Sequence, residues 1–142
     1  MSSAYTRTEF KGYLTANWTG TNTFKDISDF ETIDDFPNPP EEILVLEFVS
    51  VSEQNISLGP RDCYRERGAI NCHILVPSGY DSTNGITICE NLRNLLRGIR
   101  INNVVIESIT PPTNRDGAAL SVDGIYDGWA VSVSYYTDFF YI

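Results

Sequence analysis

One stretch decides the fold of this chain: Ala69-Ile70-Asn71-Cys72-His73-Ile74-Leu75-Val76. Apolar side chains at its even positions alternate with Asn71 and His73 at odd positions. A period of two is typical of a β-strand with one face in the core, because successive side chains point to opposite faces of a sheet. We therefore predict a half-buried strand over residues 69–76, with Cys72 and His73 on opposite faces.

The sequence after this strand changes to the period of a helix. Residues 83–97 are expected to form an amphipathic helix, because apolar side chains recur there every three or four positions. Arg93 and Arg97 suit the negative end of its dipole, and Gly98 suits its C-terminal stop. The apolar stripe consists of Ile88, Cys89, Leu92, Leu95, Leu96 and Ile99.

Four further segments complete the expected order of elements. A short helix is predicted over residues 4–18, and strands over 43–49, 104–109 and 129–135. The apolar end, residues 138–142, either adds to the sheet or is an exposed anchor. Strands that follow one another with few crossovers favour an α+β fold. We predict one domain over residues 1–142, a mainly antiparallel sheet with helices packed on one face.

Composition excludes several classes of function. The chain has 142 residues, of which 42% are hydrophobic, enough for one core and too many for a disordered chain. Its net charge of −9 argues against gripping nucleic acid and against binding anionic membranes. Three cysteines do not form a disulfide framework, and no apolar run is long enough to span a membrane. We expect a soluble protein of a reducing cytoplasm.

No motif for catalysis or metal binding is present. The one histidine, His73, lacks the spacing to cysteines or carboxylates that a zinc site needs, and no nucleophile elbow or phosphate-binding glycine loop exists. Cys72 and Cys89 are expected to be small core residues. We therefore predict no catalytic residue, no metal and no cofactor. The chain is expected to bind other proteins rather than to act as an enzyme.

Two polar segments outside the predicted core elements are candidate protein interfaces. Residues 24–42 form a long, acidic, proline-rich loop, and residues 57–67 hold a Gly-Pro turn and a mixed cluster of charges, with a short strand as an alternative for part of the segment. Ordinary solvation or weak surface ion pairs would explain both equally well. Aromatic side chains beside loops and near residue 142 join the list. The candidate interface residues are Asp26, Asp29, Asp34, Asp35, Arg61, Arg65, Arg67, Tyr126, Phe139, Phe140 and Tyr141.

A set of short motifs, in a fixed order, carries a family resemblance. The set comprises Arg65-Glu66-Arg67-Gly68 leading into Ile70–Pro77, a Gly/Asp loop at 79–84, the helix with Leu92, Leu95 and Leu96, the strand with Val104 and Ile106, Pro111-Pro112, and Asp127-Gly128-Trp129 opening the last strand. With an N-terminal helix and an early strand, this order resembles that of the tail-terminator proteins of long-tailed bacteriophages. The resemblance covers most of the chain but not the loop at 24–42.

The resemblance implies a structural virion protein. Such proteins form a hexameric ring on the head-proximal end of the tail tube, stop its polymerisation and offer a surface to the head connector. The implied partners are further copies of the chain, the tail tube protein and the neck protein, and the implied location is the virion tail, after assembly in the host cytoplasm. DNA would pass through the acidic lumen without specific binding.

Two other functions stay open at the level of sequence. One is a related neck, connector or tail-completion protein of the phage. The other, from a different class, is a small enzyme or ligand-binding domain, suggested only by the acidic loop and by His73.

Overall fold

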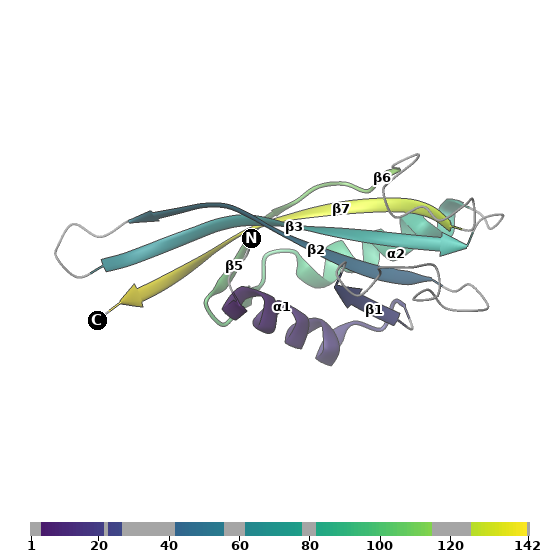
Figure 1. The fold of residues 1–142 in the computed structure, drawn as a ribbon. Coiled ribbons are helices and arrows are strands. Elements are labelled where there is room, and N and C mark those ends of the chain that lie inside the picture. Colours follow the sequence, from purple (N-terminus) through teal and green to yellow (C-terminus); the bar gives the residue numbers. More distant parts are fainter. Residues whose placement is uncertain are drawn as a thin grey trace.

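The computed structural model describes residues 4–21, 23–26, 42–55, 62–77, 82–114 and 126–141 (Figure 1). The elements follow one another as α1 (Ala4–Asn17), β1 (Thr23–Asp26), β2 (Ile43–Asn55), β3 (Asp62–Pro77), α2 (Ser82–Leu96), β4 (Arg100–Ile101), β5 (Val104–Ile109), β6 (Thr113–Asn114) and β7 (Tyr126–Tyr141).

One sheet holds all the described strands. Its order is β1-β2-β3-β7-β5-β4, and β6 pairs with β7 beside β5. Only β1 and β2 run parallel, whereas every other neighbouring pair is antiparallel. The fold is a single α+β domain with a mainly antiparallel sheet, as predicted. Neither described helix is long and apolar enough to cross a membrane.

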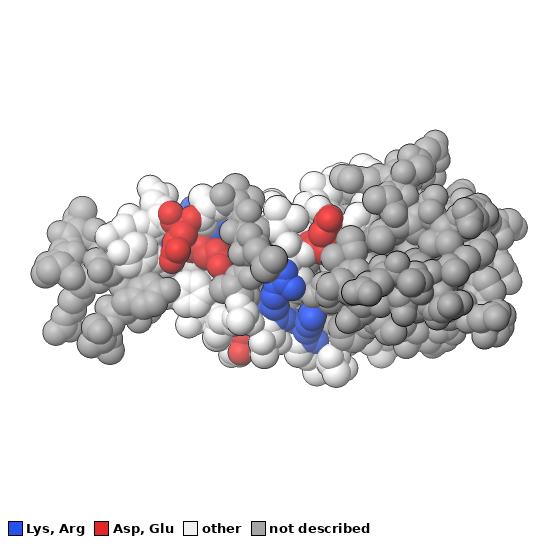
Figure 2. All heavy atoms as spheres, viewed as in Figure 1, with Lys and Arg blue, Asp and Glu red and all other residues white. Residues whose placement is uncertain are grey.

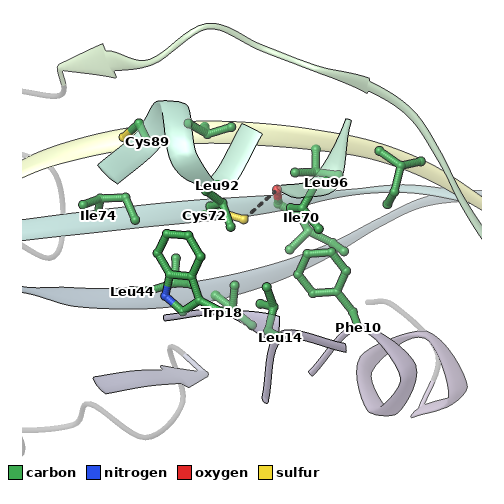
Figure 3. Close-up of a cluster of buried hydrophobic side chains, with 14 of the residues drawn as sticks. Phe10, Leu14, Trp18, Leu44, Ile70, Cys72, Ile74, Cys89, Leu92 and Leu96 are labelled. Carbon is green, nitrogen blue, oxygen red and sulfur yellow. Dashed lines mark hydrogen bonds between the residues drawn. The ribbon is translucent and has the colours of Figure 1, made fainter. Parts of the chain in front are cut away.

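Both helices pack on the same face of the sheet, which confirms the predicted layers. Strand register places Leu46, Cys72 and Val131 in one row across β2, β3 and β7, and all three are fully buried. Figure 3 shows Cys72 and other core side chains of the sheet together with those of α1 and α2. The core that they form includes Phe10 and Leu14 of α1, Leu44, Phe48, Ile70 and Ile74 of the sheet, and Cys89, Leu92 and Leu96 of α2.

The predicted helix ends have local causes. Gly98 adopts a φ of 67°, the left-handed conformation that terminates a helix without a Cβ clash.

The prediction that the alternating strand sends Cys72 and His73 to opposite faces of the sheet is also confirmed. Cys72 belongs to the core between the helices, whereas His73 pairs with Val45 in a row on the other face. His73 is nevertheless 8% exposed, so the second face is covered at that point.

The strands are longer than their apolar patterns. β3 begins at Asp62, so Arg65 and Arg67 lie in a strand, the alternative to the turn for this segment, and this strand is continuous with the one predicted over residues 69–76. β2 likewise continues past its apolar part, and β7 continues past Tyr135, so that residues 138–141 add to the sheet. The reason is physical: the extra strand length lies outside the apolar core, so no buried apolar face imposes an alternation of apolar and polar residues there.

Three short strands, β1, β4 and β6, were also missed. β1 takes the first residues of the segment predicted as a loop at 24–42, and residues 27–41 of that loop lie outside the described residues. β4 and β5 form a hairpin around Asn102 and Asn103, where Asn102 has a φ of 52°. Asparagine tolerates this left-handed conformation, and Asn-Asn between apolar residues was the available signal.

Candidate protein-interaction site

Three strands continue beyond the two helices as an arm (Figure 1). We define the arm as Ser52–Asn55 of β2, Asp62–Arg67 of β3 and Tyr136–Tyr141 of β7. Register pairs these segments side by side, with β3 in the middle. The arm contains two of the predicted interface arginines and three of the predicted aromatic residues, so it is the place where the fold gathers the sequence-predicted candidates.

A buried polar cluster lies where the arm leaves the core. The Glu66 carboxylate accepts hydrogen bonds from the Thr6 hydroxyl at 2.9 Å and from the Tyr135 hydroxyl at 2.8 Å. The hydroxyl oxygens of Thr6 and Thr137 lie 3.2 Å apart, and Thr137 is the donor because Thr6 gives its only hydroxyl proton to Glu66. The cluster therefore joins the first turn of α1 to β3 and β7.

A glycine makes room for this cluster. A Cβ on Gly68 would lie 2.6 Å from the Tyr135 hydroxyl oxygen and 2.7 Å from the carbonyl oxygen of Val49. Both distances are shorter than ordinary contacts. Gly68 is therefore the residue that lets the Tyr135 ring reach Glu66 across the sheet.

An ion pair crosses the arm on the other face of the sheet. The guanidinium of Arg65 donates from Nε and Nη2 to the two carboxylate oxygens of Asp138, at 2.8 and 3.0 Å. This bidentate geometry is the strongest form of an arginine–carboxylate contact. The hydrogen bond from Arg65 lowers the pKa of Asp138 below its usual value. Because both side chains are about one quarter exposed, the pair strengthens the arm only in part.

A second arginine extends the same arrangement towards β5. Arg67 donates to Glu107 at 2.6 Å. The Tyr136 ring lies between the two arginines, with the guanidinium carbons of Arg65 and Arg67 at 4.0 and 5.7 Å from its centre. Cation–π contacts of this kind add to an ion pair. The two arginines thus bind partners within the chain and stiffen the root of the arm.

The other predicted interface residues are placed less completely. Phe139 is half-buried in β7, where its ring meets Tyr5 of α1 edge-on, with centroids 5.8 Å apart. Tyr126, Phe140 and Tyr141 take strand positions in β7, and Asp26 takes one in β1, but their side chains lie outside the description. The remaining candidates lie outside the described residues: Asp29, Asp34, Asp35 and Arg61.

His73 belongs to a structural hydrogen-bond group. Its Nε2 lies 3.3 Å from Oε1 of Glu47, and Asn71 donates to the same oxygen at 3.0 Å. Two hollows lined by described residues lie along α1 and α2, and His73 lines neither of them; one, of about 530 Å³, lies between α1 and β4. Among described residues, no group of three or more histidine, cysteine or acidic side chains could hold a metal ion.

The two core cysteines are confirmed as structural. Cys72 is fully buried, and burial raises the pKa of its thiol; burial raises the pKa of Cys89 to about 12. A thiol with a raised pKa stays protonated and is a poor nucleophile or metal ligand. These two residues therefore contribute packing rather than chemistry.

Charges of both signs are distributed over the described surface. Figure 2 shows acidic and basic side chains in small separate groups, with no continuous patch of either sign among the described atoms of that face. On α1, Arg7 and Lys11 lie over the Phe48 ring of β2, with Arg7 Cζ 5.0 Å from the ring centre. On the opposite side of α1, Glu9 accepts a hydrogen bond from Asn102 of the β4–β5 turn.

Comparison with known proteins gives a fold and no family. No protein-family model matches the chain, and no curated protein sequence matches it. Solved structures do match. One, whose name carries no description of function, superposes with a TM-score of 0.56 over 100% of this chain and 99% of its own, at 16% identity. The likeness is one of fold. At that identity it assigns no activity and no partner.

Sequence reasoning missed the partners that hold the arm. Glu66 was quoted only as part of a charged motif, and Thr6, Tyr136 and Asp138 were not singled out. The available signal was weak: Arg65 and Asp138 lie 73 positions apart, and only the antiparallel register of β3 and β7 brings them together. A strand containing alternating Arg and Glu, with no loop residues, was the one local indication.

Proposed function

We propose that this chain is a structural virion protein that forms a ring at the head-proximal end of a bacteriophage tail tube. The resemblance to tail terminators implies that this ring is a hexamer. The ring ends tube polymerisation and offers a surface to the head connector. The sequence motifs described above support this function, and they are its main source. The fold is compatible with this function, because it is a small α+β domain with both helices on one face of the sheet.

The arm is the structural observation that carries the proposal. Apart from contacts with Tyr5 and Thr6 in the first turn of α1, these three strands have no described helix over them. They gain little from the core of their own domain, because small sheets need a buried face for stability. The chain nevertheless holds these strands in place with the Glu66 cluster and with the Arg65–Asp138 pair. Stabilising contacts of this kind are expected in an element whose remaining surface is buried by neighbouring subunits.

The charge of the chain is also compatible with a DNA conduit. Six copies, each with a net charge of −9, would surround the lumen with a negative field. DNA moves through such a passage without adhering to its wall. The alternative, another neck or tail-completion protein, would use the same arm and charge, so the experiment below separates them by the stage of assembly that fails.

The test is negative-stain electron microscopy of particles produced in cells in which the gene is silenced. Loss of a tail terminator should give overlong or irregular tails beside DNA-filled, unjoined heads. Tails of normal length that fail to join would instead indicate a neck protein. Normal, joined tails would reject both. Complementation with the unchanged gene is the control.

A further inference from the structure

The two sides of the arm differ in shape, and this difference suggests how copies meet. On one side, β1 covers β2 only from Ile43 to Leu46, so the outer edge of β2 along Ser52–Gln54 has no described strand beside it. On the other side, β5 covers β7 only as far as Thr137. Beyond that residue, no described strand continues the cover. An open strand edge is a template for pairing with another chain.

The β7 side has a step. The rows through Tyr136 and Thr137 each cross five strands, namely β2, β3, β7, β5 and β4, whereas the rows from Asp138 outward cross only the three strands of the arm. Strands lie about 4.8 Å apart, so the sheet loses roughly 10 Å of width at once. The turn at Asn102 and Asn103 borders this notch. The β2 side of the arm has no such step.

We propose that β2 of a second copy fills this notch and pairs with β7 beyond Thr137. A projecting edge and a notch on opposite sides of one subunit give a head-to-tail contact, which repeats from copy to copy and closes into a ring when the rotation allows. The inference rests on the proposed function for the ring, and it adds the contact that builds the ring.

The direction of the new strand pair follows from the topology. β2 and β7 are each antiparallel to β3, so they run in the same direction. Copies related by a rotation axis along the arm keep that direction, and the contact between them is therefore a parallel strand pair. A two-fold dimer would instead pair β2 with β2, or β7 with β7, in antiparallel fashion.

The taper of the subunit also favours a second copy over an unrelated strand. The arm is three strands wide and meets only the first turn of α1, whereas the body is five strands wide with α1 and α2 on one face. Such wedges, placed side by side around an axis that runs along the arms, form a ring that is narrower at the arm end. In addition, Arg7 and Lys11 lie on the β2 side of α1 and Glu9 on its β4 side, so adjacent copies bring unlike charges together.

Site-directed cross-linking tests the contact. All proteins carry Cys63→Ser, because Cys63 is only half-buried and pairs with Phe140 in the arm. One protein carries Glu53→Cys on β2, and a second carries Tyr141→Cys on β7. Each is treated with a short bismaleimide, alone and mixed, both as purified protein and in particles. The control mixture replaces Tyr141→Cys with Asn94→Cys, an exposed position on α2.

The expected result is a cross-linked dimer in the mixture of the first two proteins, at least tenfold more than in either protein alone or in the control. A protein with both cysteines should give a ladder that ends at the size of the closed ring. Dimers from Glu53→Cys alone would overturn the inference in favour of a two-fold contact. Absence of the mixed dimer in both settings would overturn it outright.

The outcome separates the contact from the function. Overlong tails after silencing, together with no mixed cross-link, would leave the terminator function in place and reject the strand contact. A complete ladder together with normal, joined tails would retain the contact and reject the function.

Discussion

Gly68 is the residue on which the root of the arm depends most directly. The Tyr135 hydroxyl and the carbonyl of Val49 occupy the space that any side chain at position 68 would need. Because the carbonyl belongs to the neighbouring strand, it cannot move without shifting β2. The buried Glu66 carboxylate would then lose the hydroxyl that now donates to it. Backbone crowding and an unsatisfied buried acceptor act in the same direction.

Replacement Gly68→Ala should therefore lower the free energy of unfolding by about 1–3 kcal/mol, the usual cost of overpacking. Urea denaturation followed by circular dichroism measures it. The matched control is Gly12→Ala in α1, where a Cβ would meet nothing within 4 Å. That change should raise stability by roughly 0.5–1 kcal/mol, as in other exposed helix positions. Equal effects of the two changes would contradict this account.

Asp138 should make the free energy of unfolding depend on pH in the acid range. Its pKa is lowered in the folded chain by the hydrogen bond from Arg65, from an ordinary value of 3.8. A carboxylate whose folded pKa is depressed contributes stability above its unfolded pKa and loses it as the pH falls through the folded pKa. Stability should thus decline from about pH 5 downwards, partly through this group.

In Asp138→Asn this part of the decline should be absent, so the variant is less stable than the parent at pH 6 and approaches it near pH 2. Urea titrations at each pH measure the difference. The comparison is Glu53→Gln, an exposed carboxylate on β2, which should run parallel to the parent. A constant gap between Asp138→Asn and the parent would show that the ion pair does not titrate as described.

At the scale of elements, α1 is held to the sheet by apolar packing and by polar contacts, of which those of Thr6 are buried. Phe10 and Leu14 are fully buried, and near the start of the helix Thr6 reaches Glu66. A helix of 14 residues is marginal in isolation, so its order depends on this docking. The contact at Thr6 also couples the helix to the arm.

Thr6→Val should keep the shape of the side chain and remove the hydrogen bond to Glu66. A buried acceptor that loses one donor costs about 1–3 kcal/mol. Hydrogen exchange of the α1 amides should accelerate more than that of the α2 amides. Thr8→Val, at an exposed position of the same helix, is the control and should leave both rates nearly unchanged. Uniform acceleration across the molecule would mean that α1 does not open by itself.

The sequence predicted those elements whose local signals agree with their burial. α2 and β5 were found almost to the residue, because an apolar stripe and Gly98 mark the helix, and an apolar run before Pro111-Pro112 marks the strand. The arm was predicted only as alternatives, because Asp62–Arg67 lies beyond the apolar core and its pattern is set by partners in β7. Pairing partners 73 positions apart, such as Arg65 and Asp138, leave no local trace.

At the scale of the whole molecule, net charge governs association. Copies that each carry −9 repel one another when they come together. Added salt shortens the screening length from about 30 Å at 0.01 M to about 8 Å at 0.15 M, which weakens long-range repulsion more than short contacts. A ring built mainly on strand pairing should therefore form more readily in salt.

Sedimentation velocity over this range should show self-association strengthening several-fold as ionic strength rises. The parallel measurement with Arg7→Gln and Lys11→Gln together should show weaker association at both salt concentrations, since each copy loses two positive charges beside β2. Association that weakens steadily with salt would mean that opposite charges, rather than strand pairing, hold the copies together.

The position of β7 in the sheet has a consequence for how the chain is made. β7 is synthesised after all other described elements, yet it lies between β3 and β5. Until it emerges, β1, β2 and β3 form one fragment and β4 with β5 another, with no strand to join them. Contacts so distant in sequence form slowly, and the nascent fragments expose unpaired edges meanwhile. A subunit that is able to assemble therefore exists only after β7 has been synthesised and inserted between β3 and β5.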